Sequence, residues 1–155
     1  MNSPVQALEG VPNACQLLPN VVTGGQPSAA NLAAFKAAGG WGVLDLRDPM
    51  EPRPLDEHAA AAGLGLEYVN VPVGAGTLSD ATLERVLAVM RQAGDGLVLV
   101  HCASGNRVGG ALIPFLMLDH GLEEEDAVSQ AMRVGLRSAE LMEWGLDYAR
   151  RNRSP

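Results

Sequence analysis

A short segment, HCASGNR at residues 101–107, places a thiol and a guanidinium at the two ends of a glycine-containing loop. It follows the apolar run LVLV at residues 97–100, a pattern typical of a buried strand. At the carboxyl end of such a strand, loop amides and the first turn of the next helix converge on anions. These amides and Arg107 stabilise a thiolate and so lower the pKa of a thiol held there. The spacing predicts a Cys102 nucleophile beneath an oxyanion site that needs no metal.

The neighbours of Cys102 are expected to shape the loop and hold the anion. Arg107 has a planar fork that can donate to two oxygens of a tetrahedral anion. His101 precedes the nucleophile on a buried strand, so we expect it to hydrogen-bond loop carbonyls and not to act as the base. Gly105 and Asn106 suit the unusual φ values of a tight curl. The predicted substrate-binding positions are Ala103, Ser104, Gly105, Asn106 and Val108.

A cysteine after an apolar strand is more often a small buried hydrophobe than a nucleophile. For Cys102, the combination of histidine, glycine, arginine and a following helix favours catalysis. Cys15 lies in a segment without a nearby charged partner, and we expect it to be incidental. His58 and His120 lack the spacing of metal ligands, so the sequence predicts no metal site.

Apolar runs alternate with amphipathic segments along the chain, which predicts an α/β fold. We expect a three-layer sandwich with a mainly parallel central sheet flanked by helices. Residues 18–155 are predicted to form a single domain after an irregular N-terminal lead-in over residues 1–17. Strands are expected at 20–23, 42–46, 66–73 and 97–100, and helices at 29–38, 56–62, 80–92, 111–118, 123–134 and 138–150.

Composition excludes several classes of function. The 155 residues carry a net charge of −7, which disfavours a general nucleic-acid or anionic-membrane binder. Two cysteines do not make a disulfide scaffold in a chain of this length. The sequence contains no run of 18 apolar residues, so it predicts no membrane span. Residues 1–19 do not have the pattern of a secretory signal. We therefore expect a cytoplasmic protein, and the oligomeric state stays open.

The segment HCASGNR resembles the active-site loop of the cysteine-based protein tyrosine phosphatase superfamily. The stretches TGGQPS at 23–28 and VLDLRD at 43–48, followed by this loop, resemble its bacterial beta-lactamase-hydrolase-like phosphatase branch. The resemblance spans about residues 18–150. It implies a phosphatase-like fold, with Cys102 as nucleophile and Arg107 as phosphate ligand. It also implies attack on a phosphate monoester through a phosphocysteine, without a cofactor. The expected substrate is a phosphorylated small molecule or a phosphoprotein.

Three departures from the superfamily pattern leave alternatives open. Four residues separate Cys102 from Arg107 where the superfamily has five, and Val108 replaces a serine or threonine. The stretch NVPVGAGT at 70–77, where a general-acid aspartate is expected, has no carboxylate. Asp48 is our candidate for a relocated acid, with Glu51 beside it; Asp80 is better explained as stabilising a helix start.

The short loop is similar to that of the rhodanese sulfurtransferases, which carry sulfur on cysteine as a persulfide. Sulfur transfer needs no general acid, because it proceeds by sulfur–sulfur chemistry at the thiolate. A sulfurtransferase or persulfide carrier using Cys102 is therefore the alternative function. A domain that binds anions at this loop without catalysis is a further alternative.

Overall fold

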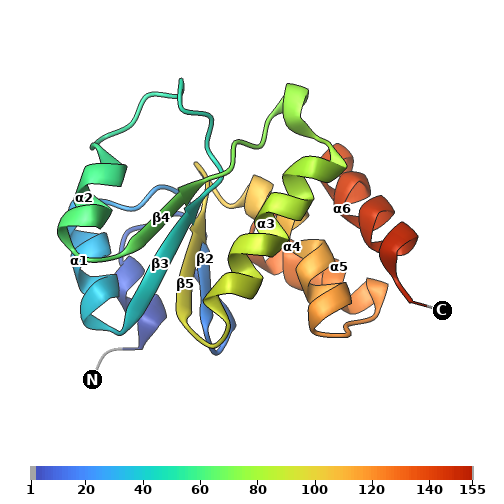
Figure 1. The fold of residues 1–155 in the computed structure, drawn as a ribbon, viewed down its shortest axis with the longest axis horizontal. Coiled ribbons are helices and arrows are strands. Elements are labelled where there is room, and N and C mark those ends of the chain that lie inside the picture. The colour runs from blue at the N-terminus through green and yellow to red at the C-terminus, as the bar shows by residue number, and fades with distance from the viewer. Residues whose placement is uncertain (1–2, 155) are drawn as a thin grey trace.

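The computed structural model describes residues 3–154. These residues form a five-stranded sheet, which lies among the helices (Figure 1). The strands lie in the order β1-β2-β5-β3-β4. The β2–β5, β5–β3 and β3–β4 pairs are parallel, whereas β1 is antiparallel to β2, so the predicted mainly parallel sheet is confirmed. The loop that follows β5 therefore leaves from the middle of the sheet. The strands are β1 (Cys15–Leu18), β2 (Val21–Gly24), β3 (Gly40–Asp45), β4 (Glu67–Asn70) and β5 (Leu97–His101).

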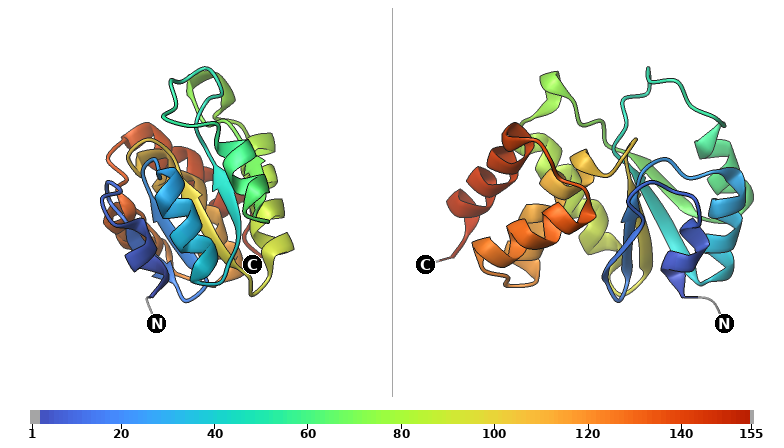
Figure 2. Two further views of the ribbon diagram at one scale, coloured as in Figure 1. Left: turned by 90° about the vertical axis from the view of Figure 1, so that its left-hand side faces the viewer. Right: turned by 180° about the vertical axis from the view of Figure 1, so that it is seen from behind.

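Helices cover both faces of the sheet, which confirms the three-layer architecture (Figure 2). One face packs against α1 (Ala29–Ala37), α2 (Glu57–Gly63) and the 3₁₀ turn η1 (Pro4–Leu8). The other face carries the larger core and the remaining helices. These are α3 (Asp80–Ala93), α4 (Asn106–Pro114), α5 (Glu124–Val134) and α6 (Ala139–Asn152), with a 3₁₀ turn η2 (Ala75–Thr77) and a π-helical turn η3 (Phe115–Asp119).

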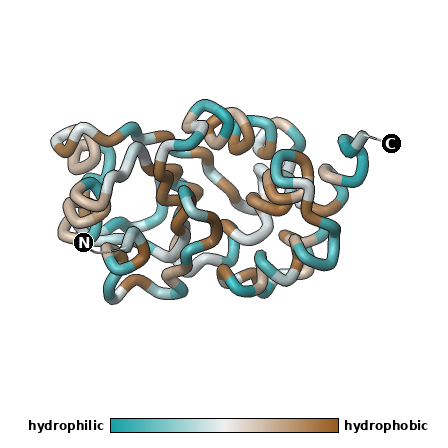
Figure 3. The backbone as a smooth tube through the Cα atoms, turned by 90° about the horizontal axis from the view of Figure 1, so that it is seen from below, coloured by the Kyte–Doolittle hydropathy of each residue, from teal (hydrophilic) through white to brown (hydrophobic). Residues whose placement is uncertain are grey.

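Apolar residues recur along the strands and the inward faces of the helices (Figure 3). The central strands β2, β3 and β5 are buried along nearly their whole length, as is typical of parallel strands covered on both faces, whereas the helices bury one face. Among residues 3–154, no helix is both long and apolar enough to cross a membrane.

The N-terminal segment differs from the irregular lead-in expected over residues 1–17. Pro4–Leu8 forms the 3₁₀ turn η1, and Cys15–Leu18 forms the edge strand β1. Leu8 and Val11 are buried in the core beneath α1, so a domain boundary at residue 18 would divide the sheet and this core. Four residues of strand are too few to show a clear alternation in a proline-containing sequence. Residues 1–2 of the predicted lead-in lie outside the described part of the chain.

Helix α4 begins earlier than the apolar pattern at 111–118 suggests. It starts at Asn106 and includes Arg107 in its first turn, because the Gly105 backbone is left-handed and directs the chain straight into the helix. Pro114 has no backbone N–H, and the chain continues from it into the π-helical turn η3. The early start matters for the site, since it places the guanidinium at the amino end of α4.

Candidate active site

The thiol of Cys102 lies at the base of a tight loop between β5 and α4. The backbone N–H of Cys102 donates to the carbonyl oxygen of Gly24 at 3.2 Å, and the residue is only 1% exposed. The N–H of Gly105 donates to the Cys102 Sγ at 3.0 Å. Gly105 has φ +101°, and a Cβ there would lie 2.6 Å from the Val134 carbonyl oxygen. Conformation and space therefore both require glycine, and the resulting curl gives the sulfur a backbone donor.

The guanidinium of Arg107 faces a carboxylate of the protein itself. Its Nη1 donates to Glu51 Oε2 at 2.7 Å and its Nη2 to Glu51 Oε1 at 3.0 Å. These hydrogen bonds, with the Asp48 N–H, lower the pKa of Glu51 from 4.5 to about 2 although partial burial opposes the shift. Nη1 also lies 3.4 Å from the Val73 carbonyl. A carboxylate thus binds the fork of Arg107 in the way expected for two oxygens of a bound oxyanion.

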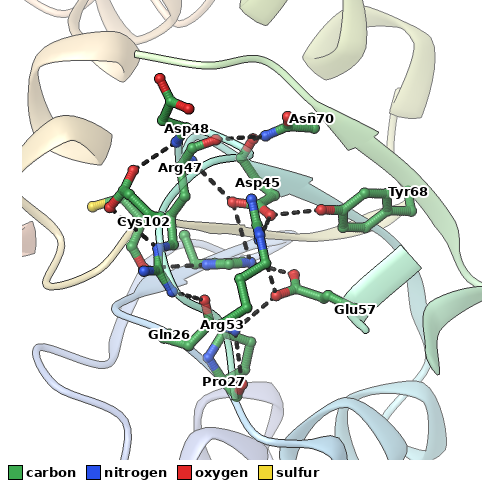
Figure 4. A network of polar contacts seen from close by, with 12 residues as sticks. Gln26, Pro27, Asp45, Arg47, Asp48, Arg53, Glu57, Tyr68, Asn70 and Cys102 are labelled. Carbon is green, nitrogen blue, oxygen red and sulfur yellow. Dashed lines mark hydrogen bonds and ion pairs between the residues drawn. The ribbon is translucent and has the colours of Figure 1, made fainter. Parts of the chain in front are cut away.

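Asp48 shapes the turn that presents Glu51. Its Oδ1 accepts a hydrogen bond from the Met50 N–H at 2.8 Å, and its own N–H donates to Glu51 Oε2 at 2.6 Å. Its carboxylate is solvent-exposed and points away from Cys102 (Figure 4). This geometry does not support the general-acid role predicted for Asp48.

The two other acid candidates are also engaged with arginines. Arg107 holds the pKa of Glu51 near 2, well below that of an ordinary carboxyl, so at neutral pH Glu51 has no proton to give a leaving group. Asp80, in the first turn of α3, accepts hydrogen bonds from Arg151 of α6 at 2.8 and 2.9 Å, and these lower its pKa. None of the three carboxyls therefore stands ready as a protonated acid at Cys102.

Backbone carbonyls of the loop accept hydrogen bonds from neighbouring segments. The Ala103 carbonyl accepts from the Gln26 N–H at 3.2 Å, and the Ser104 carbonyl accepts from Asn13 Nδ2 at 2.6 Å. Asn13 has a left-handed backbone, with φ +55°. The side chains of Ala103 and Ser104 are exposed, so both remain available to a ligand.

The side chains of Asn106 and Val108 are turned to structural contacts. Asn106 Oδ1 accepts the backbone amides of Arg137 and Ser138, at 2.7 and 3.2 Å, and so fixes the connection between α5 and α6. Val108 is fully buried in the core against the sheet. Because α4 begins at Asn106 and turns Val108 inward, these two residues can meet a substrate only through their backbone, and the anion-binding role of the loop amides stays a prediction.

Sequence reasoning missed three residues that hold the loop. Gly25 must be small, since a Cβ there would lie 2.4 Å from the Ala103 carbonyl oxygen. Gln26 and Asn13 supply the donors described above. The stretch TGGQPS gave a family resemblance that includes Gly25 and Gln26, whereas nothing in the sequence marked Asn13.

A buried polar network lies behind the loop (Figure 4). His101 Nδ1 lies 3.2 Å from the Cys102 carbonyl oxygen, the kind of contact expected from the sequence, and Nε2 contacts Glu57 Oε2. Asp45 accepts hydrogen bonds from Arg53 and from the Tyr68 hydroxyl, the latter at 2.6 Å. Burial and the hydrogen bond to Asp45 raise the pKa of Tyr68, so this hydroxyl remains a donor.

Asp45, Glu57 and His101 bring three potential metal-ligand atoms within 4.8 Å of one another. Arg53 contacts Asp45 and lies 3.8 Å from Glu57, so a guanidinium already brings positive charge to both carboxylates. Burial alone would lower the pKa of Arg53. The hydrogen bond that Arg53 makes to Asp45, together with the negative charge of Asp45, raises this pKa instead, so the arginine stays charged. We assign no metal site to this cluster.

The sequence is similar to two known bacterial proteins that share one name. No protein-family model matches it. Over 106 residues, 66% of this chain, it is 27% identical to the Beta-lactamase hydrolase-like protein of Agrobacterium fabrum strain C58. Over 87 residues, 54% of this chain, it is 33% identical to the protein of the same name from Xylella fastidiosa strain Temecula1. The chain is thus similar in sequence to one part of these beta-lactamase hydrolase-like proteins. It spans only 24% and 20% of the lengths of these two relatives.

Solved structures share the fold over nearly the whole chain. A DUF442 protein from Shewanella putrefaciens CN-32 superposes with a TM-score of 0.81 at 21% identity, covering 95% of this chain and 97% of that one. Tk-PTP gives 0.73 at 23% identity over 90% of this chain and 98% of its own. TpbA of P. aeruginosa gives 0.69 at 21% identity over 89% and 83%. The predicted tyrosine-phosphatase-like fold is confirmed.

Proposed function

We propose that the protein is a cysteine-dependent phosphatase-like hydrolase that attacks phosphate monoesters with Cys102. The observation that carries this proposal is the loop itself: the Gly105 N–H donates to the Cys102 Sγ, and Arg107 lies at the amino end of α4. The shared fold supports it. A TpbA variant has been crystallised with phosphotyrosine, which favours a phosphorylated substrate for this chain as well.

The reaction would begin with in-line attack of the Cys102 thiolate on phosphorus. The bond from phosphorus to the leaving oxygen breaks, and its electron pair stays on that oxygen. Arg107 and the loop amides hold the equatorial oxygens as negative charge shifts among them. Water then attacks the phosphocysteine, releasing inorganic phosphate and regenerating the thiolate. Arg107 must exchange the carboxylate of Glu51 for phosphate oxygens before the first step.

The leaving oxygen has to take its proton from water, because the nearby carboxyls are engaged elsewhere. A positioned acid accelerates such a step by roughly 10²–10⁴-fold. The protein is therefore expected to hydrolyse p-nitrophenyl phosphate, whose leaving group needs no protonation, much faster than phenyl phosphate. Comparable rates for the two esters would reveal an acid that Asp48, Glu51 and Asp80 do not supply.

The decisive experiment measures p-nitrophenyl phosphate hydrolysis by the wild type, Cys102→Ser and the control Cys15→Ser. We expect phosphate release to vanish in Cys102→Ser and to persist in Cys15→Ser, since Cys15 lies on the edge strand β1. Undiminished turnover in Cys102→Ser would refute the mechanism.

Sulfur transfer is the second candidate, and the ion pair of Glu51 with Arg107 favours it. That pair leaves no protonated carboxyl at the loop, and a persulfide needs none. The Cys102 thiolate would attack the outer sulfur of thiosulfate, and sulfite would leave as the sulfur–sulfur bond breaks. Cyanide would then take the added sulfur as thiocyanate and restore the thiolate. Cys102-dependent thiocyanate without phosphate release would establish this alternative.

A domain that only binds anions would give neither product. Phosphate or sulfate would then raise the melting temperature without any turnover, through ligand linkage. The same two assays, with a melting curve in phosphate, therefore separate all three functions.

A further inference from the structure

A second thiol, that of Cys15, lies on the edge strand β1 and takes no part in the mechanism above. Nothing in the sequence around Cys15 supplies a charged partner, but the fold brings one from α5, 118 residues further along the chain. The Nη1 of Arg133 donates to the Cys15 Sγ at 2.8 Å. A guanidinium in this place stabilises negative charge on the sulfur, and the thiolate is the reactive form of cysteine.

The guanidinium of Arg133 is held in position by neutral acceptors. Its Nε and Nη2 donate to Gln130 Oε1 on the same helix, at 2.9 and 2.7 Å. Nη2 also donates to the carbonyl oxygen of Gln16 at 3.2 Å. These acceptors fix the direction of the guanidinium without cancelling its charge. The Cys15 sulfur is therefore the contact of this set that can carry a matching negative charge.

The Thr23 hydroxyl is a separate observation at the same place. Thr23 is fully buried, and its Oγ1 has no hydrogen-bond partner among the described residues. It lies directly opposite Cys15 in the antiparallel pair of β1 and β2, so both side chains project to the same face of the sheet. A valine would fill this space without burying an unpaired hydroxyl. The hydroxyl lacks an acceptor, which an oxygen bonded to the Cys15 sulfur would supply.

We propose that Cys15 is a modification site, at which hydrogen peroxide oxidises the thiol to a sulfenate that Arg133 and Thr23 hold. The thiol first gives its proton to water. The sulfur then attacks one peroxide oxygen: the sulfur–oxygen bond forms, the oxygen–oxygen bond breaks, and the other oxygen leaves as hydroxide. Sulfur loses two electrons and the peroxide gains them. The new oxygen accepts hydrogen bonds from the Thr23 hydroxyl and from Arg133.

The position of Cys15 admits a small oxidant and keeps the product from forming a disulfide with Cys102. Cys15 is 7% exposed at the edge of the sheet, and Arg133 beside it is exposed. Strand β2 separates β1 from β5, so the backbones of the two cysteines are about 10 Å apart across two strand spacings. A disulfide spans less than about 7 Å between Cα atoms. The sulfenate should therefore persist until an external thiol reduces it.

Oxidation is best measured in the Cys102→Ser variant, in which Cys15 is the remaining thiol. Hydrogen peroxide is added, the sulfenate is trapped with dimedone, and the adduct is located by peptide mass spectrometry. We expect the Cys15 adduct to form about tenfold faster in the folded protein than in the same variant unfolded in urea, because only the folded chain brings Arg133 to the sulfur. An equal or slower rate in the folded protein would overturn the proposal. This variant lacks the proposed nucleophile, so the result does not depend on phosphatase activity.

Two substitutions in the Cys102→Ser background test the two donors separately. Arg133→Gln removes the charge and should slow formation of the adduct about tenfold. Arg85→Gln, an exposed change on α3, is the matched control and should leave the rate unchanged. Thr23→Val should leave the rate of oxidation nearly unchanged but shorten the lifetime of the sulfenate, which is measured by adding dimedone after a delay.

The melting temperature separates the role of Thr23 from a loss of folding. Reduced Thr23→Val should melt no lower than its parent, because the substitution removes an unpaired buried hydroxyl. A shorter sulfenate lifetime in a protein of undiminished stability would then come from the lost hydrogen bond. An unchanged rate in Arg133→Gln, or an unchanged lifetime in Thr23→Val, would overturn the proposal.

Discussion

Two arginine–carboxylate pairs differ in what surrounds them: a front pair, Arg107–Glu51, at the Cys102 loop, and a rear pair, Arg53–Asp45, next to His101. At the front, Arg107 and Glu51 are 21% and 28% exposed; behind, Arg53 is 17% exposed and Asp45 is fully buried. Asp45 also accepts from Tyr68 and from the Arg47 N–H. The front pair can exchange its carboxylate for a ligand because water can solvate the released group. The rear pair has no such substitute, so it serves the fold.

The largest effect expected from this contrast is on Asp45. Asp45→Asn keeps the volume but removes the nearer carboxylate of Arg53, which is left with only Glu57 at 3.8 Å. Breaking a buried pair in this way costs about 3 kcal/mol or more in the free energy of unfolding. Urea denaturation should show the loss, with Asp95→Asn on the exposed turn before β5 as a control near zero. A loss under about 1 kcal/mol would make the rear pair equivalent to a surface pair.

The second effect concerns Gly25, which lies against the backbone of the Cys102 loop at Ala103. A Cβ at Gly25 would lie 2.4 Å from the Ala103 carbonyl oxygen, and backbone cannot move aside as a side chain can. Gly25→Ala should therefore destabilise the protein by about 2 kcal/mol and slow alkylation of Cys102 as the loop shifts.

Gly63→Ala is the matched control for this change. No atom lies within 4 Å of its added Cβ, and the residue ends helix α2. It should leave alkylation unchanged and stabilise the protein slightly, by about 0.5 kcal/mol. Equal effects of the two substitutions would mean that Gly25 is not needed for the shape of the loop.

The layers of the fold could be predicted because each depends on local pattern. The run LVLV at 97–100 and the helical face of Leu83, Val86, Leu87 and Met90 each specify their own element. Strand β1 escaped prediction because its burial alternates over only four residues and depends on pairing with β2. Helix α4 was expected to begin late, since its first turn consists of loop-type residues whose conformation is set by Gly105.

The candidate site could likewise be predicted only where it depends on local sequence. Cys102, His101 and Arg107 are close in sequence, so their spacing was enough to suggest their chemistry. Their partners come from distant positions: Glu51 is 56 residues from Arg107, and Asn13 is 91 from Ser104. A loop with three prolines carries no periodicity from which the position of Glu51 could be inferred. Only the folded chain brings its carboxylate to Arg107.

The third effect tests whether the front pair is exchangeable. Glu51→Gln removes the charge that competes with an anion for Arg107. Stability should change by less than about 1 kcal/mol, as for other partly exposed pairs. The affinity for inorganic phosphate, measured by isothermal titration calorimetry, should rise. Unchanged affinity would indicate that Glu51 does not compete with phosphate, and Arg107→Gln should abolish binding in either background.

The smallest effect is the pH dependence of this pair, and its sign follows from the pKa of Glu51. Arg107 lowers that pKa from 4.5 to about 2 in the folded protein, so the pair stabilises the folded state above pH 4.5. This contribution should disappear as the pH falls from 4.5 towards 2, because the carboxyl then becomes protonated in both states. The difference in unfolding free energy between the wild type and Glu51→Gln should accordingly shrink over this range. Because both side chains reach solvent, added salt should also reduce the difference above pH 4.5. A difference that survives at pH 2 would have to come from the shape of the loop after β3 and not from the charge, and the front pair would then share the structural role of the rear one.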